Sequence, residues 1–170
     1  MNNLNKNSTM LCMTGLFAAM ITLMTGFILH IPYGTNGGYV HFGDAFIYIA
    51  ASILPRPYAI AAALIGAGLA DLLTAPAWMI ATIIIKFLLV MLFKSQNDQL
   101  LTKRNMAAPI LAIPVTVIGY YIAEGILFGS FITPVASVPG NLIQSAGSII
   151  IYYFIAGALQ KTNLRSLRAL

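Results

Sequence analysis

Charged residues are scarce in this chain. Only 8% of its 170 residues are charged, whereas 59% are hydrophobic. A soluble domain normally has about a quarter charged residues, so this composition indicates a membrane protein. The nine basic residues outnumber the four acids and give a net charge of +5, but they are too scattered to form a face that binds nucleic acid.

Cysteine is nearly absent as well. The single cysteine, Cys12, excludes a disulfide within the chain and a metal site built from several cysteines. The motifs G-x-x-x-x-G-K-[ST], H-E-x-x-H and G-x-S-x-G, which mark phosphate loops, zinc sites and serine nucleophiles, do not occur. We therefore expect no enzymatic activity, no metal and no other cofactor.

The chain has instead six apolar stretches that are separated by helix breakers. The first is too long for the hydrophobic core of a signal peptide, so we interpret it as a retained transmembrane helix. The sequence thus predicts an all-α membrane protein, a six-transmembrane-helix bundle in one domain of residues 1–170. The predicted spans cover about residues 10–31, 39–54, 58–73, 78–93, 106–128 and 138–159. Several are shorter than the roughly 20 residues that cross a bilayer untilted, and these should be packed inside the bundle.

The lysines and arginines predict the orientation of the bundle. The three loops on one side contain none of them. The termini and the two loops on the other side contain Lys6, Arg56, Lys94, Lys103, Arg104, Lys161, Arg165 and Arg168. Because basic residues stay in the cytoplasm, we expect both termini to be cytoplasmic in a multi-pass protein of the cell membrane.

Polar and ionisable side chains, which are energetically unfavourable in a lipid bilayer, lie within or at the ends of the predicted spans. An ionisable group near the bilayer centre costs about 2.5–3.5 kcal/mol, so such groups usually pair or line a cavity. Five spans bring polar groups to the outer half of the bundle, which predicts a shared, outward-facing pocket. The predicted substrate-binding residues are Tyr39, His41, Asp44, Asp71, Trp78, Lys86, Glu124 and Asn141.

Several of these residues also have a purely structural interpretation. His41 and Asp44, three positions apart, should share one helix face. Asp44 either contributes to the pocket or caps its helix, and His41 either contacts ligand or anchors the chain at the membrane interface. Asn141 is either a helix cap or an amide that contacts a polar ligand.

Residues of the third and fourth spans also have two interpretations each. Lys86 either contacts substrate or forms an internal salt bridge with Asp71 or Glu124. Asp71 itself is a candidate cap for the loop after the third span. Trp78 belongs either to the aromatic belt at the membrane surface or to a site that stacks on a flat ligand.

The first span carries small residues at helical spacing. Gly15 and Ala19 are four residues apart, as are Ala18 and Thr22. This spacing lets another helix approach closely. The partner is either a helix of the same bundle or another subunit.

Three segments together resemble a known family. Gly43-Asp44 opens the second span, G-A-G-L-A-D at residues 66–71 closes the third, and Lys86 lies within the fourth. In this order and six-span frame they resemble the substrate-binding S components of energy-coupling factor (ECF) vitamin transporters. The segments YYIAEGILFG and VPGNLIQS are similar to that family too.

The resemblance implies a subunit that captures a vitamin or vitamin precursor outside and topples in the bilayer to deliver it inward. It implies a transmembrane coupling subunit and two cytoplasmic ATPases as partners. Where the family commonly has A-x-x-x-A in the first helix, this chain offers Gly15, Ala18 and Ala19 for docking. The loop between the first two helices would be a lid, with Gly34, Asn36, Gly37 and Gly38.

The charge balance suggests the kind of ligand. Three intramembrane acids against Lys86 disfavour a strongly anionic ligand. A small neutral or cationic heterocycle, such as a pyridoxine or pyrimidine precursor, is the favoured substrate. The alternative is a stand-alone transporter of a small metabolite, coupled to protons through Asp44, Asp71 or Glu124.

Overall fold

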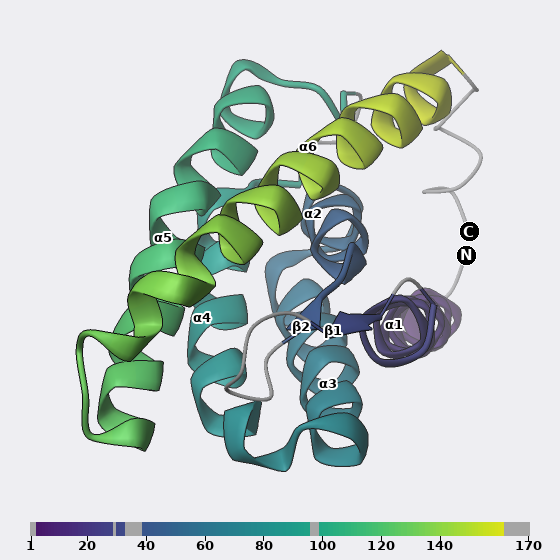
Figure 1. Cartoon of the computed structure of the whole chain (residues 1–170). Coiled ribbons are helices and arrows are strands. Elements are labelled where there is room, and N and C mark those ends of the chain that lie inside the picture. Colours follow the sequence, from purple (N-terminus) through teal and green to yellow (C-terminus); the bar gives the residue numbers. More distant parts are fainter. Residues whose placement is uncertain (1–2, 29, 33–38, 96–98, 162–170) are drawn as a thin grey trace.

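The structure is a computed structural model that describes residues 3–28, 30–32, 39–95 and 99–161. These residues form a bundle of six α-helices with a small β-hairpin at one end (Figure 1), which confirms the predicted all-α class. The helices are α1 (Asn3–Gly26), α2 (Gly43–Ile53), α3 (Arg56–Thr74), α4 (Met79–Leu92), α5 (Lys103–Phe128) and α6 (Val138–Lys161). Two short 3-10 helices, η1 (Pro76–Trp78) and η2 (Thr133–Ser137), precede α4 and α6.

Local sequence signals explain several helix boundaries. Pro55 adopts an extended backbone between α2 and α3, since a proline cannot continue the preceding helix. The Thr102 side chain accepts a hydrogen bond from the Asn105 N–H and so caps the start of α5. Gly129 ends α5 with φ of 65°, a conformation that glycine adopts without strain.

The connection between α1 and α2 differs from the predicted one. α1 ends at Gly26, before the predicted end of the first span, and α2 begins at Gly43 rather than at Tyr39. The residues between them include strands β1 (Ile31–Pro32) and β2 (Tyr39–Val40), which pair antiparallel. Backbone hydrogen bonding to another strand replaces helical bonding here. The predicted lid residues Gly34, Asn36, Gly37 and Gly38 lie outside the described residues.

Within the part of the chain that the structure describes, four helical segments are long and apolar enough to cross a membrane. They are Lys6–Gly26, Arg56–Thr74, Lys103–Phe128 and Thr133–Lys161. The apolar segments Gly43–Ile53 and Pro76–Leu92 are shorter. α2 is the central helix, because most of its side chains are buried against α1, α3, α4 and α6. A short helix in this position is shielded by its neighbours, as expected from its length.

α1 packs closely against α3 through one of its two small faces. The Thr22 hydroxyl donates to the carbonyl oxygens of Ala18 and Gly66, both at 2.9 Å. Gly15 and Ala19 are exposed on α1. The Ala18–Thr22 spacing therefore serves packing within the bundle, and the Gly15–Ala19 spacing does not.

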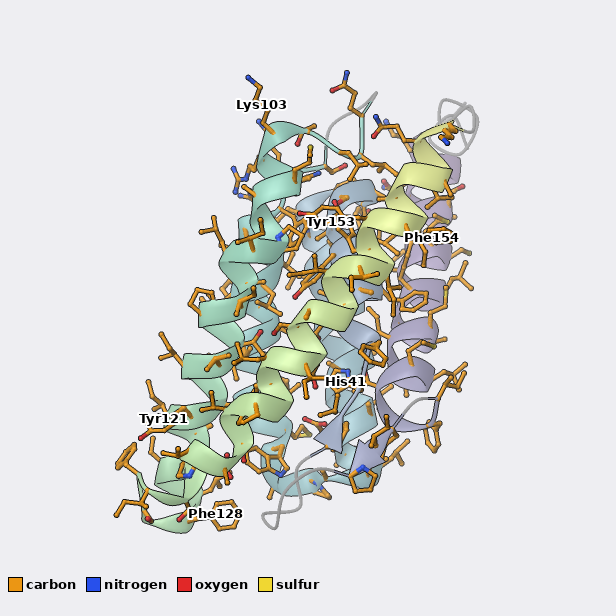
Figure 2. The ribbon with its side chains drawn as sticks, turned by 45° about the horizontal axis from the view of Figure 1, so that its top comes forward. His41, Lys103, Tyr121, Phe128, Tyr153 and Phe154 are labelled. Carbon is orange, nitrogen blue, oxygen red and sulfur yellow. The ribbon has the colours of Figure 1, made fainter. Side chains whose placement is uncertain are left out.

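The two ends of the bundle differ in chemistry. Figure 2 shows Lys103 at one end, and Tyr121 and Phe128 at the opposite end, with His41 toward the latter. The Lys103 end also carries Arg104, which donates hydrogen bonds to the carbonyls of Met91 and Leu92 at the end of α4. The hairpin and both 3-10 helices belong to the other end, which is where the predicted pocket should open.

Candidate functional site

A pocket opens at the hairpin end of the bundle. It contains about 510 Å³ of space between atoms, including the part that is open to the outside. β2, α3, α4, α5 and α6 all contribute side chains. The lining residues are Tyr39, Val40, His41, Asp71, Trp78, Thr82, Tyr120, Glu124, Ser137, Gly140, Asn141 and Gln144.

Most of the side chains predicted to bind substrate meet at this pocket. The ones that line it are Tyr39, His41, Asp71, Trp78, Glu124 and Asn141. Asp44 and Lys86 do not line it. They are fully buried next to it, where they form an ion pair.

Aromatic side chains form one part of the wall. The Trp78 ring lies 6.2 Å from the Tyr120 ring in a T-shaped arrangement, and the Tyr120 hydroxyl lies 2.9 Å from the Thr82 hydroxyl. The Trp78 side chain is only 8% exposed. It is therefore packed inside the bundle, on the face where a flat ligand could stack, and not in a belt that faces lipid.

Asp71 connects the hairpin to the end of α3. Its Oδ1 accepts a hydrogen bond from the Tyr39 hydroxyl. The Tyr39 ring in turn stacks on His30, with 3.9 Å between ring centroids. The Asp71 side chain thus holds strand β2, which lines the pocket, and this is a different contact from the predicted loop cap.

Glu124 and Asn141 face the pocket from α5 and α6. The Ser137 hydroxyl donates to Glu124 Oε1 at 2.9 Å, which joins the start of α6 to α5. Asn141 lies one turn inside α6, since the helix begins at Val138. It is therefore not the helix cap, and its side chain lines the pocket.

The buried ion pair corrects the expected partners of Lys86. Its Nζ lies 2.7 Å from Asp44 Oδ1, with both side chains 0% exposed. The salt bridge thus forms with α2, and not with Asp71 or Glu124. The rotation of α2 about its axis, which apolar periodicity does not determine, brings Asp44 toward α4.

The relation between His41 and Asp44 also differs from the prediction. α2 begins at Gly43, so His41 precedes the helix and shares no helix face with Asp44. His41 Nδ1 accepts a hydrogen bond from the Gly43 N–H at 3.1 Å. The N-cap position is Phe42, without a side-chain cap. The interpretation of Asp44 as a cap is therefore wrong.

Gln144 joins the ion pair to the pocket. Its Nε2 donates to Asp44 Oδ2 at 3.2 Å, and its Oε1 accepts from the His41 N–H at 3.3 Å. Lys86 Nζ also lies 5.3 Å from the centroid of the Tyr120 ring, within range of a cation–π contact. Two pocket-lining residues, Gln144 and Tyr120, therefore touch the buried charges directly.

The predicted set of substrate-binding residues omits several lining residues that helical spacing could have added. Thr82 lies midway between Trp78 and Lys86, four residues from each. Tyr120 precedes Glu124 by four residues, and Gln144 follows Asn141 by three. On a helix these separations place side chains on the same face. The other missed residues are Val40, Ser137 and Gly140.

Comparison with known families identifies the class of protein. The family described as ECF-type riboflavin transporter, S component, matches residues 5–161. No curated protein matches the chain. The match covers nearly the whole sequence and confirms the resemblance inferred from the motifs. The chain therefore belongs to the ECF-type riboflavin transporter S component family, and it is a multi-pass membrane protein.

Proposed function

We propose that this protein is the substrate-binding subunit of an ECF-type importer and that its pocket binds riboflavin. The observation that carries the proposal is the pocket itself, in which aromatic rings and uncharged polar groups from four helices and the hairpin converge. The family description names riboflavin. It is a neutral heterocycle, the class favoured from the sequence, but larger than the pyridoxine or pyrimidine precursor suggested there.

The charges around the pocket support a neutral ligand. Asp71 and Glu124 line the pocket, whereas its described lining includes no lysine or arginine. The charge of Lys86 is compensated by Asp44 at 2.7 Å. A phosphate or carboxylate on the ligand would therefore meet acids without a free cation, which disfavours anionic vitamins.

The lining residues suit the two chemical parts of a flavin. The Trp78 and Tyr120 rings can pack against the flat fused rings. The amides of Asn141 and Gln144 and the hydroxyls of Thr82 and Ser137 offer donors and acceptors to the polar ring edge and the hydroxylated chain.

Family membership supports the rest of the transport cycle. The subunit would work with a transmembrane coupling subunit and two cytoplasmic ATPases, and would topple to release its substrate inside. This favours ATP-driven import over proton coupling. Gly15 and Ala19 are exposed on α1 and are the proposed docking residues, whereas Ala18 already packs against α3. The basic end of the bundle, with the termini, would face the cytoplasm.

Direct binding tests the proposed substrate. Purified protein in nanodiscs should bind riboflavin with a Kd below about 1 µM, which quenching of flavin fluorescence measures. Flavin mononucleotide, which adds a phosphate to the same ring system, should bind at least about tenfold more weakly. Pyridoxine and pantothenate serve as comparison ligands. Tighter binding of pyridoxine than of riboflavin, or no binding of riboflavin, would contradict the proposal.

Trp78 should contribute strongly to that affinity. Trp78→Ala removes a ring at the pocket wall, and the Kd for riboflavin should rise about tenfold or more. Phe128→Ala is the matched control, because Phe128 packs 6.2 Å from Trp78 but does not line the pocket. Its Kd should change less than about threefold. Equal losses in both variants would mean that Trp78 acts through packing alone.

A further inference from the structure

The Gln144 carboxamide has one favourable orientation in this structure. A carboxylate can only accept hydrogen bonds and a backbone N–H can only donate them. The Gln144 nitrogen therefore faces Asp44, and its oxygen faces the His41 N–H. Turning the amide over would place oxygen against carboxylate and NH2 against N–H, which costs both hydrogen bonds.

Lys86 keeps the charge of Asp44 in place. An isolated carboxylate at 0% exposure would be very unfavourable, and the ammonium 2.7 Å away compensates it. The same ammonium lies beneath the Tyr120 ring. Lys86 and Asp44 thus contact two pocket residues from behind while lining none of the pocket themselves.

We propose that the Asp44–Lys86 ion pair is a positioning element that fixes the donor and acceptor order of Gln144 in the pocket. Each atom of the amide retains capacity beyond its bond in the structure, since Nε2 carries a second N–H and Oε1 a second lone pair. In this role the oxygen stays on the His41 side and the nitrogen on the Asp44 side, so the remaining acceptor and donor would face a ligand in fixed order along one edge of the amide. This edge complements a ligand with an N–H beside a C=O, as in the pyrimidinedione ring of a flavin.

This inference rests on the proposed function for its choice of ligand, and a pair of ligands tests it. Riboflavin and N3-methylriboflavin differ only in whether the ring nitrogen can donate. The wild-type protein should prefer riboflavin by about tenfold or more, because the methylated ring leaves the Gln144 oxygen without its donor.

The paired variant Asp44→Asn/Lys86→Met removes both charges with little change in volume. Asn at position 44 can donate as well as accept, so turning Gln144 over no longer costs the hydrogen bond at position 44, and only the His41 N–H still favours the original orientation. The preference for riboflavin should fall below about threefold, while the Kd for N3-methylriboflavin changes little. Gln144→Leu should give the same loss, and adding the paired variant to Gln144→Leu should have no further effect on the preference.

Controls separate positioning from general destabilisation. Ser52 lies in α2, away from Asp44, and its buried hydroxyl contacts the Tyr152 hydroxyl of α6. Ser52→Ala should leave the preference for riboflavin unchanged. If the paired variant does not fold, Asp44→Glu keeps both charges but moves the carboxylate away from its place beside Gln144, and the same loss of preference is expected.

The outcomes distinguish the two proposals. Failure of the wild type to bind riboflavin would overturn the proposed function. Riboflavin binding with an unchanged preference in folded Asp44→Asn/Lys86→Met or Asp44→Glu would overturn the positioning role. Equal weakening of both ligands, additive with Gln144→Leu, would overturn it as well, since that pattern indicates a structural effect alone.

Discussion

Lys86→Met is expected to lower the free energy of unfolding by about 3–5 kcal/mol. The substitution leaves Asp44 as an uncompensated charge at 0% exposure, where Lys86 Nζ lay 2.7 Å from its Oδ1. The hydrogen bond from Gln144 alone does not offset the loss of the cation. Denaturation in detergent, followed by circular dichroism, measures the change.

Two further variants isolate the cause of this loss. Asp44→Asn/Lys86→Met should recover most of the lost stability, because no buried charge remains and the volumes are similar. Lys103→Met, at an exposed lysine of the basic end, should change the free energy of unfolding by less than about 0.5 kcal/mol. Equal stability of the wild type and the single variant would mean that Asp44 and Lys86 do not form a buried ion pair.

The sequence predicted the helices well where breakers and caps mark them. Pro55 and Gly129 end helices for local reasons that need no tertiary information. The hairpin of β1 and β2 was not predicted, because strands of two residues are too short to show alternation. Its residues were therefore assigned to the neighbouring apolar spans.

The sequence predicted at which end of the bundle the pocket lies, but not which side chains pair within it. Asp71 and Glu124 lie near the ends of their helices at the same end of the bundle, and they belong to the polar groups of five spans that suggested a common cavity. The partner of Lys86 was not predictable, since three acids lay at similar depth in the predicted spans. The rotation of each helix decides among them, and helices that are apolar on all faces do not reveal it in their sequence.

The lining residues that were not predicted have the same explanation, because the sequence does not show which face of each helix points inward. Thr82 and Tyr120 are uncharged and attract no notice as single residues in an apolar helix. They become candidates only when the face that carries Trp78 or Glu124 is known to be the inner one. Charged residues were selected first, because they cost most to insert in lipid. For this reason Asp44 and Lys86, which we propose to be a positioning pair, were included among the expected ligand contacts.

Gly66→Ala is expected to lower the free energy of unfolding by about 1–3 kcal/mol. A Cβ at this position would lie 2.7 Å from the Ala18 carbonyl oxygen and 2.7 Å from Ile21 Cβ. A backbone oxygen cannot move aside as a flexible side chain can, so α1 and α3 must separate. The hydrogen bond from Thr22 to the Gly66 carbonyl would lengthen with them.

Gly68→Ala is the matched control on the same helix. A Cβ there would meet only Ile83 side-chain atoms at 3.6 Å, an ordinary contact. Alanine is the better helix former, so this variant should be as stable as the wild type or gain about 0.5–1 kcal/mol. The opposite signs of the two changes would show that the α1–α3 contact, and not glycine content, stabilises this side of the bundle. Equal stability of the two variants would contradict the close approach of α1 to Gly66.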